Sequence, residues 1–282
     1  MRPYIICMTE ANYGDLKTVP YPVRNGSYAL GTAASLFVKN KQWKHNTVIN
    51  VHLTGDDLLK EFVQQTITTH MPPLGVEFAF VDDWDRSHIR VALGMLTNGN
   101  WSYLGTDALS ISRNEYTMMI FNATNETTIL HEFGHALGLH HEHLHPNANI
   151  LWNKEAVYDE LMSSQGWSRG YIDTQMFNHS DDYLATEFDP KSIMMYYIPT
   201  AWTLDDSVYY PNNVFTNEDV QALQQLYPPD PTQEKHTHPY YPSIDLFTVI
   251  VVSFVVIEAV VLSALIFKWY MNPKRNKVSV PI

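Results

Sequence analysis

The stretch that decides the fold runs from residue 131 to residue 142 and reads His131-Glu132-Phe133-Gly134-His135-Ala136-Leu137-Gly138-Leu139-His140-His141-Glu142. It contains the pattern H-E-x-x-H-x-x-G-x-x-H in full. His131 and His135 are four residues apart, so an α-helix places both imidazoles on one face, one turn apart. Gly138 can adopt a positive φ, which lets the helix end there and brings His141 back toward the same point.

This arrangement predicts a catalytic zinc site. Neutral imidazoles are good zinc ligands, and three of them, His131, His135 and His141, leave the fourth position open, as in catalytic rather than structural zinc sites. Glu132 follows the first ligand directly and is placed to take a proton from a water that the metal activates. The cofactor expected is therefore a single catalytic Zn²⁺ ion.

Two other interpretations compete with this one. The histidines could belong to a His-rich surface helix, although the extended pattern fixes five positions in eleven residues and is far more specific than H-E-x-x-H alone. His140 and His143 flank the third ligand and could replace it. The spacing favours His141, and we expect the other two to lie behind the ligands or to face solvent.

Composition limits the class of protein. The chain has 282 residues, 45% of them apolar, and a net charge of −12. That charge argues against nucleic acid as a partner, since nucleic acid needs a basic face. The single cysteine, Cys7, excludes an intramolecular disulfide. Five N-x-S/T sequons, more than chance predicts, occur at Asn25, Asn100, Asn122, Asn125 and Asn178.

The hydrophobic pattern before the zinc helix predicts a mixed sheet with an antiparallel edge. The expected strands cover 48–53, 76–81, 88–93, 101–105 and 117–121, with a helix from Asp56 to about Thr69 between the first two. Asn125 or Thr127 is expected to cap the zinc helix. After it we expect helices over 153–162 and 168–177, a loop over 181–187, and a last helix capped by Thr216.

The chain divides into five segments. Residues 1–41 are punctuated by proline and glycine and are expected to form an N-terminal extension or a short pro-segment, without a recognisable signal peptide. Cys7 could serve there as a latency thiolate on the zinc, or be a half-buried thiol. The peptidase domain is expected over 42–228, a Pro-rich stalk over 229–245, a membrane anchor over 246–267 and a basic tail over 268–282.

The segment 246–267 has the features of a single transmembrane helix. Its 22 residues contain one charged side chain, Glu258. They span about 33 Å as a helix, enough for a bilayer core. Glu258 is expected to be protonated or to meet a partner helix. The basic tail places the catalytic domain outside the cytosol by the positive-inside rule, whereas a tail-anchored insertion would leave it in the cytosol.

A second motif narrows the family. The zinc pattern is that of the metzincin peptidases, and Ser192-Ile193-Met194-Met195-Tyr196 resembles the Met-turn of astacins, S-x-M-x-Y. The resemblance implies a zincin-like α+β fold: a twisted mixed sheet, the zinc helix and a C-terminal helical subdomain. It also implies that Met194 forms a floor beneath the histidines and that Tyr196 reaches the zinc or the developing oxyanion. Tyr197 could take that role instead.

Two further segments, residues 101–108 and 188–194, look like parts of astacin-like and matrixin-like peptidases. The resemblance covers roughly residues 42–228. It implies that Trp101, Ser102, Tyr103 and Leu104 form the edge strand that pairs with substrate. The sequence departs from typical astacins in lacking their cysteines and the Arg/Asp-rich run after the third histidine, and Met195 stands where many have histidine.

The expected function is that of a membrane-anchored zinc endopeptidase, which hydrolyses peptide bonds of a protein or peptide substrate with Glu132 as general base. The alternative is a catalytically silent zinc-fold module for binding or adhesion, tethered to a membrane. The intact Glu132 favours the enzyme, because a silent module has no need of the base.

Overall fold

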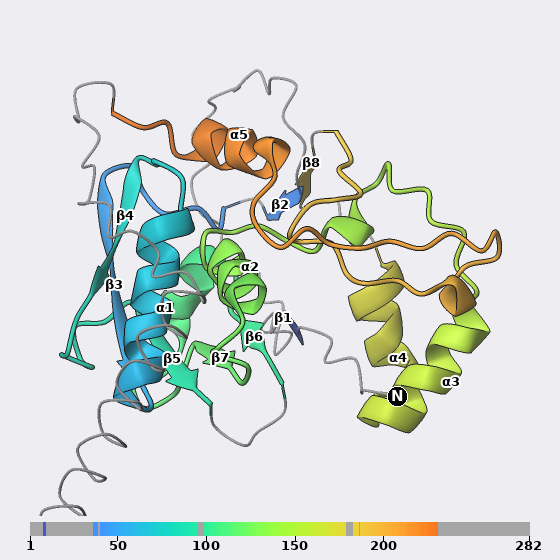
Figure 1. Ribbon diagram of the computed structural model, residues 1–282, viewed down its shortest axis with the longest axis horizontal. Coiled ribbons are helices and arrows are strands. Elements are labelled where there is room, and N and C mark those ends of the chain that lie inside the picture. Colours follow the sequence, from blue (N-terminus) through green and yellow to red (C-terminus); the bar gives the residue numbers. More distant parts are fainter. Residues whose placement is uncertain are drawn as a thin grey trace, which may run out of the picture. The chain divides into compact units, whose positions relative to one another are not determined.

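The computed structural model describes residues 8–9, 36–38, 40–94, 99–178, 183–185 and 187–230 (Figure 1). Among these residues, no helix combines the length and the apolar character that crossing a bilayer requires. The predicted anchor, the basic tail and all of the predicted stalk beyond residue 230 lie outside the described residues, and so does Cys7.

A six-stranded mixed sheet organises the N-terminal half, with strand order β1-β6-β7-β5-β3-β4. Its strands are β1 (Met8–Thr9), β3 (Thr47–Thr54), β4 (Val76–Phe80), β5 (Ile89–Leu93), β6 (Trp101–Ser102) and β7 (Met118–Ile120). β3 pairs in parallel with β4 and β5, and β5 in parallel with β7. β6 runs antiparallel to β7, so the predicted mixed sheet is confirmed.

Two helices pack side by side on this sheet (Figure 1). In α1 (Asp57–His70), Asp56 accepts a hydrogen bond from the Leu58 amide at 2.9 Å as the predicted cap. The second helix, α2 (Glu126–Ala136), carries the zinc motif. Both bury apolar side chains in what we call the sheet core, which includes Val51, Val63, Ile67, Val91, Ile129 and Phe133. Each such side chain contributes about 1.5–3 kcal/mol by leaving water.

The C-terminal part has a core of its own, here called the C-terminal core, which includes Val157, Ile172, Met176, Ile198 and Trp202. It is built from α3 (Lys154–Gln165), α4 (Arg169–Ile172), the π-helical turn η3 (Asp173–Phe177) and the 3₁₀ turn η4 (Thr200–Trp202). The helix expected over 168–177 is therefore present, but its second half is π-helical. The last helix, α5 (Asn217–Leu226), returns to the sheet core through Ala222 and Leu223.

One local prediction was wrong. The segment 181–187, expected to be a loop, contains strand β8 (Tyr183–Ala185), which pairs antiparallel with β2 (Leu36–Val38). Such a short strand forms only because a distant segment pairs with it, so its own sequence carries no signal. Leu36 and Phe37 are fully buried, so the end of the predicted extension 1–41 is part of this fold.

Candidate metal centre

Helix α2 places the first two histidines. The Asn125 side chain accepts a hydrogen bond from the Thr128 amide at 3.0 Å, which identifies Asn125 rather than Thr127 as the cap. The helix then runs unbroken to Ala136. His131 and His135 project from one face, with ring centroids 4.7 Å apart. Both rings are buried, so the helix presents them to the protein interior rather than to water.

The turn after α2 brings in the third histidine. Gly138 adopts a φ of 93°, a left-handed conformation that an L side chain adopts only with strain. The amide of Leu139 bonds back to the Gly134 carbonyl at 3.0 Å, which closes the helix end. The amide of His140 then bonds to the Leu36 carbonyl at 2.8 Å, so β2 holds the chain as it turns toward His141.

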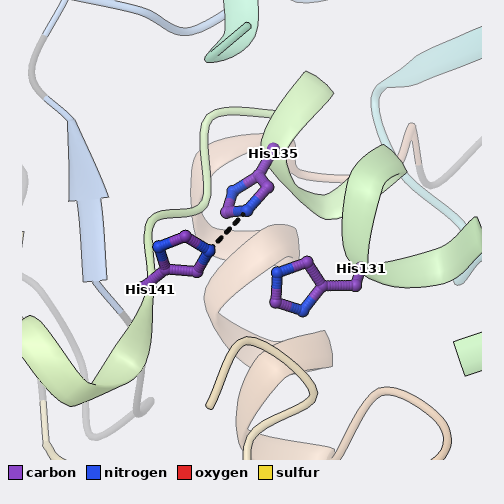
Figure 2. Close-up of side chains that lie close together, drawn as sticks. All are labelled: His131, His135 and His141. Carbon is purple, nitrogen blue, oxygen red and sulfur yellow. Dashed lines mark hydrogen bonds between the residues drawn. The ribbon is translucent and has the colours of Figure 1, made fainter. Parts of the chain in front are cut away.

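The three predicted ligands, His131, His135 and His141, converge (Figure 2). Their ligand nitrogens all lie within 4.8 Å of one another, and the Nε2 atoms of His135 and His141 are 3.0 Å apart. Nitrogens bound to one tetrahedral zinc at 2.0–2.1 Å would be about 3.4 Å apart. Among the described residues, these three form the one group of histidine, cysteine or acidic side chains gathered closely enough for a metal.

Hydrogen bonds orient the imidazoles for a metal. The Nδ1 atoms of His131 and His135 lie 2.8 Å from the carbonyls of Ile193 and Leu139. Both Nδ1 atoms therefore carry the proton and donate it, which leaves each Nε2 with a lone pair. The His131 Nε2 is buried and has no hydrogen-bond partner within the described part of the chain. A buried lone pair without a donor costs free energy, and a bound cation removes that cost, so the residues present fit zinc.

The Met-turn lies beneath α2. A Cβ added to Gly134 would come within 2.7 Å of the Met194 sulfur, so only glycine lets the methionine approach the helix this closely. The Met194 carbonyl also accepts a hydrogen bond from the Glu142 amide at 3.0 Å. Met194 is thus in contact with the helix that carries two of the histidines.

A buried carboxylate that the sequence did not reveal holds the Met-turn. Asp219, in the first turn of α5, accepts hydrogen bonds from the Ser192 hydroxyl at 2.6 Å and from the Ile193 amide at 3.0 Å. It also accepts one from the Thr216 amide at 3.0 Å, which completes the capping box of the helix. Since the Ile193 carbonyl accepts from His131, Asp219 is linked to a zinc ligand through a single residue.

The structure distinguishes the neighbouring candidates. The Tyr196 ring lies 4.2 Å from the His141 ring between centroids, whereas Tyr197 packs on Tyr210 at 5.2 Å. His140 accepts a hydrogen bond from the His141 amide through Nδ1 at 2.7 Å and is not a member of the ligand group. Glu132 is fully buried on α2 beside the first ligand.

The predicted substrate strand is shorter than expected, and it is not an edge strand, because β1 and β7 pair with its two sides. Only Trp101 and Ser102 form β6, and the 3₁₀ turn η1 (Gly105–Ser110) begins soon after it. Leu104 is buried, and Tyr103 packs against the sheet core. β6 pairs with β7 on one side and, in parallel, with Met8–Thr9 of β1 on the other.

In the metal-free protein, the free energy of unfolding is expected to fall as the pH drops from about 6.5 toward about 4. Burial lowers the pKa of His131 and of His140 to about 4. Burial, with help from neighbouring imidazoles, also holds the pKa of His135 and of His141 well below the usual value. Such groups stabilise the fold above the unfolded-state pKa of about 6.5, and acid removes that contribution.

Two buried carboxyls have the opposite effect on how the free energy of unfolding depends on pH. Burial raises the pKa of Glu142 and of Asp219, so their contribution is fully present at low pH and is lost as the pH rises. Urea unfolding in chelator across this pH range measures the net effect, for which we expect the four histidines to dominate. His140→Asn keeps an acceptor for the His141 amide without titrating, so it should weaken the pH dependence. Stability that stays flat or rises on acidification contradicts the prediction.

The fold and the site together define a zinc metallopeptidase whose metal ligands come from one helix and the turn after it, above a methionine. The family model named Astacin, which describes a family of peptidases, matches residues 36–211. The chain belongs to the astacin family. Of the two families in the resemblance, astacin-like and matrixin-like, the match therefore selects the first.

Solved structures give the same result. One described as "Structure of myroilysin" is 33% identical, has a TM-score of 0.64, and covers 69% of this chain and 99% of its own. A second, "Crystal structure of myroilysin", is 29% identical with a TM-score of 0.55 and covers 79% and 91%. High choriolytic enzyme 1, a hatching enzyme zinc-protease from Oryzias latipes, is 15% identical with a TM-score of 0.47 over 67% and 96%, a likeness too weak to add to the assignment. A comparison with curated proteins gave no match.

The protein is a zinc metalloendopeptidase, which favours the enzyme over the silent binding module. Astacin-family peptidases use one catalytic zinc, and His131, His135 and His141 are the group that can hold it here.

Proposed function

We propose that this enzyme cleaves peptide bonds with Glu132 as the general base and Tyr196 as a stabiliser of the oxyanion, and that it acts while anchored to a membrane. The observation that supports the chemistry is the convergence of three buried imidazoles, with Glu132 on the same helix. A bound zinc would supply Lewis acidity, polarising the scissile carbonyl and lowering the pKa of a water toward about 7.

The side chains then have separate tasks. His131, His135 and His141 hold the metal in neutral form, as their burial favours. The Glu132 carboxylate takes the proton of the attacking water and passes it to the leaving amine. The Tyr196 hydroxyl donates a hydrogen bond to the oxygen of the scissile carbonyl as negative charge develops on it.

Casein zymography of the piece 1–243 tests the peptidase chemistry. This piece keeps the whole described part of the chain and omits the predicted anchor. We expect a clearing band that a zinc chelator removes and that added zinc restores. Activity that persists in chelator, or no activity with one zinc bound per chain, would refute the proposal.

We further propose that residues 246–267 anchor the enzyme and that its catalytic domain lies outside the cytosol. The apolar run and the basic tail support this orientation. Three sequon asparagines, Asn122, Asn125 and Asn178, are exposed and could accept a glycan. Asn100 could not, because it is buried and its side-chain oxygen accepts hydrogen bonds from the Phe121 and Asn122 amides at 2.8 and 3.3 Å.

Expression of the full chain in eukaryotic cells tests the orientation. A lumenal domain should give a band that an N-glycosidase shifts, and the shift should shrink in Asn122→Gln and Asn125→Gln but not in Asn100→Gln. Protease protection of membrane vesicles gives an independent reading. A catalytic domain that lacks glycan and is digested in intact cytosol-facing-out vesicles would place it in the cytosol. Recovery of the full chain in the soluble fraction would refute the anchor.

A further inference from the structure

The ring of Tyr196 contacts two histidine rings. Its centroid lies 4.2 Å from that of His141, tilted by 46°, and 4.4 Å from that of His143, nearly parallel at 21°. His141 is a member of the metal group, whereas His143 is not. The peptidase mechanism described above therefore gives no role to the histidine that stacks on its proposed oxyanion donor.

His143 is itself fixed by the C-terminal core. It lies in the 3₁₀ turn η2 (Glu142–Leu144) and is 1% exposed. Its Nε2 lies 2.9 Å from the carbonyl of Gln175, to which it donates, and its ring meets that of Trp152 edge-on at 6.2 Å. Gln175 belongs to the π-helical turn η3, a type of turn that is rare and often found at functional sites. The edge of the imidazole is thus hydrogen-bonded to Gln175, while its face lies against the ring of Tyr196.

We propose that His143 is a positioning residue that holds the Tyr196 ring against His141 and so keeps the phenol hydroxyl oriented for catalysis. This inference rests on the proposed role of Tyr196. A flat ring stacked on another restricts rotation of its partner. A catalytic hydrogen bond requires a donor fixed within a few tenths of an ångström. Removing the stacked ring frees Tyr196 to leave that geometry. The His143 ring also stacks on that of His141, with centroids 5.5 Å apart, so zinc content has to be measured alongside activity.

A double-mutant cycle on the full chain tests the proposal. Tyr196→Phe, which removes only the hydroxyl, should lower kcat about 100-fold. His143→Ala should lower kcat about tenfold with little change in KM. The two together should lose no more than Tyr196→Phe alone, because the ring that His143 positions then has no hydroxyl to offer. Zinc content, measured by elemental analysis, should stay at one per chain in all variants.

His52→Ala is the control, since it removes a partly buried imidazole that meets an aromatic ring, that of Trp84, edge-on in the sheet, away from the histidine group. It should leave kcat within about twofold of wild type. If His143→Ala does not fold, the cycle is built with His143→Leu, which fills the buried space but removes the flat ring that stacks on Tyr196.

Three results would contradict the proposal, and each has a different meaning. Loss of activity in His143→Ala that multiplies with the loss in Tyr196→Phe would show that His143 acts on something else. Zinc below one per chain in the His143 variant would mean that it supports the metal instead. An unchanged kcat in Tyr196→Phe would remove the role of Tyr196 from the proposed function, and this inference with it, while leaving zinc and Glu132 untouched.

Discussion

Replacing Glu132 with alanine is expected to lower kcat/KM for peptide cleavage by about 10³-fold while one zinc stays bound per chain. A positioned general base contributes about 10²–10⁴ in rate. Glu132 is fully buried and is not a member of the metal group, so its loss leaves the three imidazoles in place. The measurement is turnover of a quenched fluorescent peptide together with elemental analysis of the purified protein.

Two companion variants make this result specific. Glu132→Gln keeps the size and hydrogen-bonding capacity of the side chain but cannot accept the proton, so it should lose as much activity as the alanine variant. Glu126→Ala removes a half-exposed carboxylate from the first turn of the same helix and should leave turnover within about twofold. Wild-type turnover in Glu132→Ala with zinc bound would exclude Glu132 as the base.

Replacing Asp219 with alanine is expected to lower the free energy of unfolding by about 3–5 kcal/mol. Two buried donors, the hydroxyl of Ser192 and the amide of Ile193, and one partly buried donor, the amide of Thr216, would lose their acceptor. Each unsatisfied buried polar group costs about 1–3 kcal/mol, and relaxation recovers part of the sum. Urea unfolding in the presence of a chelator measures this loss without a contribution from bound metal.

The same variant should bind zinc about 10- to 100-fold more weakly, as is typical when a group behind a metal ligand is lost. The route runs from Asp219 through the Met-turn to the Ile193 carbonyl, which orients His131. Competition with a chromogenic chelator gives the affinity. Glu218→Ala is the control, because Glu218 is exposed in the same helical turn. A loss of stability below about 1 kcal/mol in Asp219→Ala, or unchanged zinc affinity, would show that the network does not support the site.

The local parts of the site could be predicted from sequence. The spacing of His131 and His135 requires only a helix, and a helix needs only nearby residues and a cap. The turn at Gly138 is equally local, since a positive φ is a property of that residue. The resemblance supplied Met194 and Tyr196. In the structure Met194 packs against α2 and the Tyr196 ring lies against that of His141, while their roles in catalysis stay predictions.

The remainder depends on contacts between distant segments. Asp219 reads in sequence as an ordinary acidic residue near the start of a helix, and only the packing of α5 against the Met-turn gives it a second task. His143 reads as a competing metal ligand, and its contact with Tyr196 requires the C-terminal core to be folded. The sequence of β8 does not by itself predict a strand, because the strand depends on its pairing with the distant β2. One sequence signal could have suggested that Asp219 bonds to the Met-turn. It is the capping pattern of Thr216 and Asp219 in α5, taken together with Ser192, which opens the Met-turn.

The pairing of β1 with β6 also affects how the enzyme would bind its substrate. If substrate pairs with β6 as the resemblance implies, it competes with Met8–Thr9, which already pair with that strand. A segment tethered to its own binding site competes at an effective concentration of about millimolar, whatever the concentration of enzyme. Free substrate must overcome that tethered competitor, so the apparent KM would exceed the intrinsic one, and diluting the enzyme would not relieve the difference.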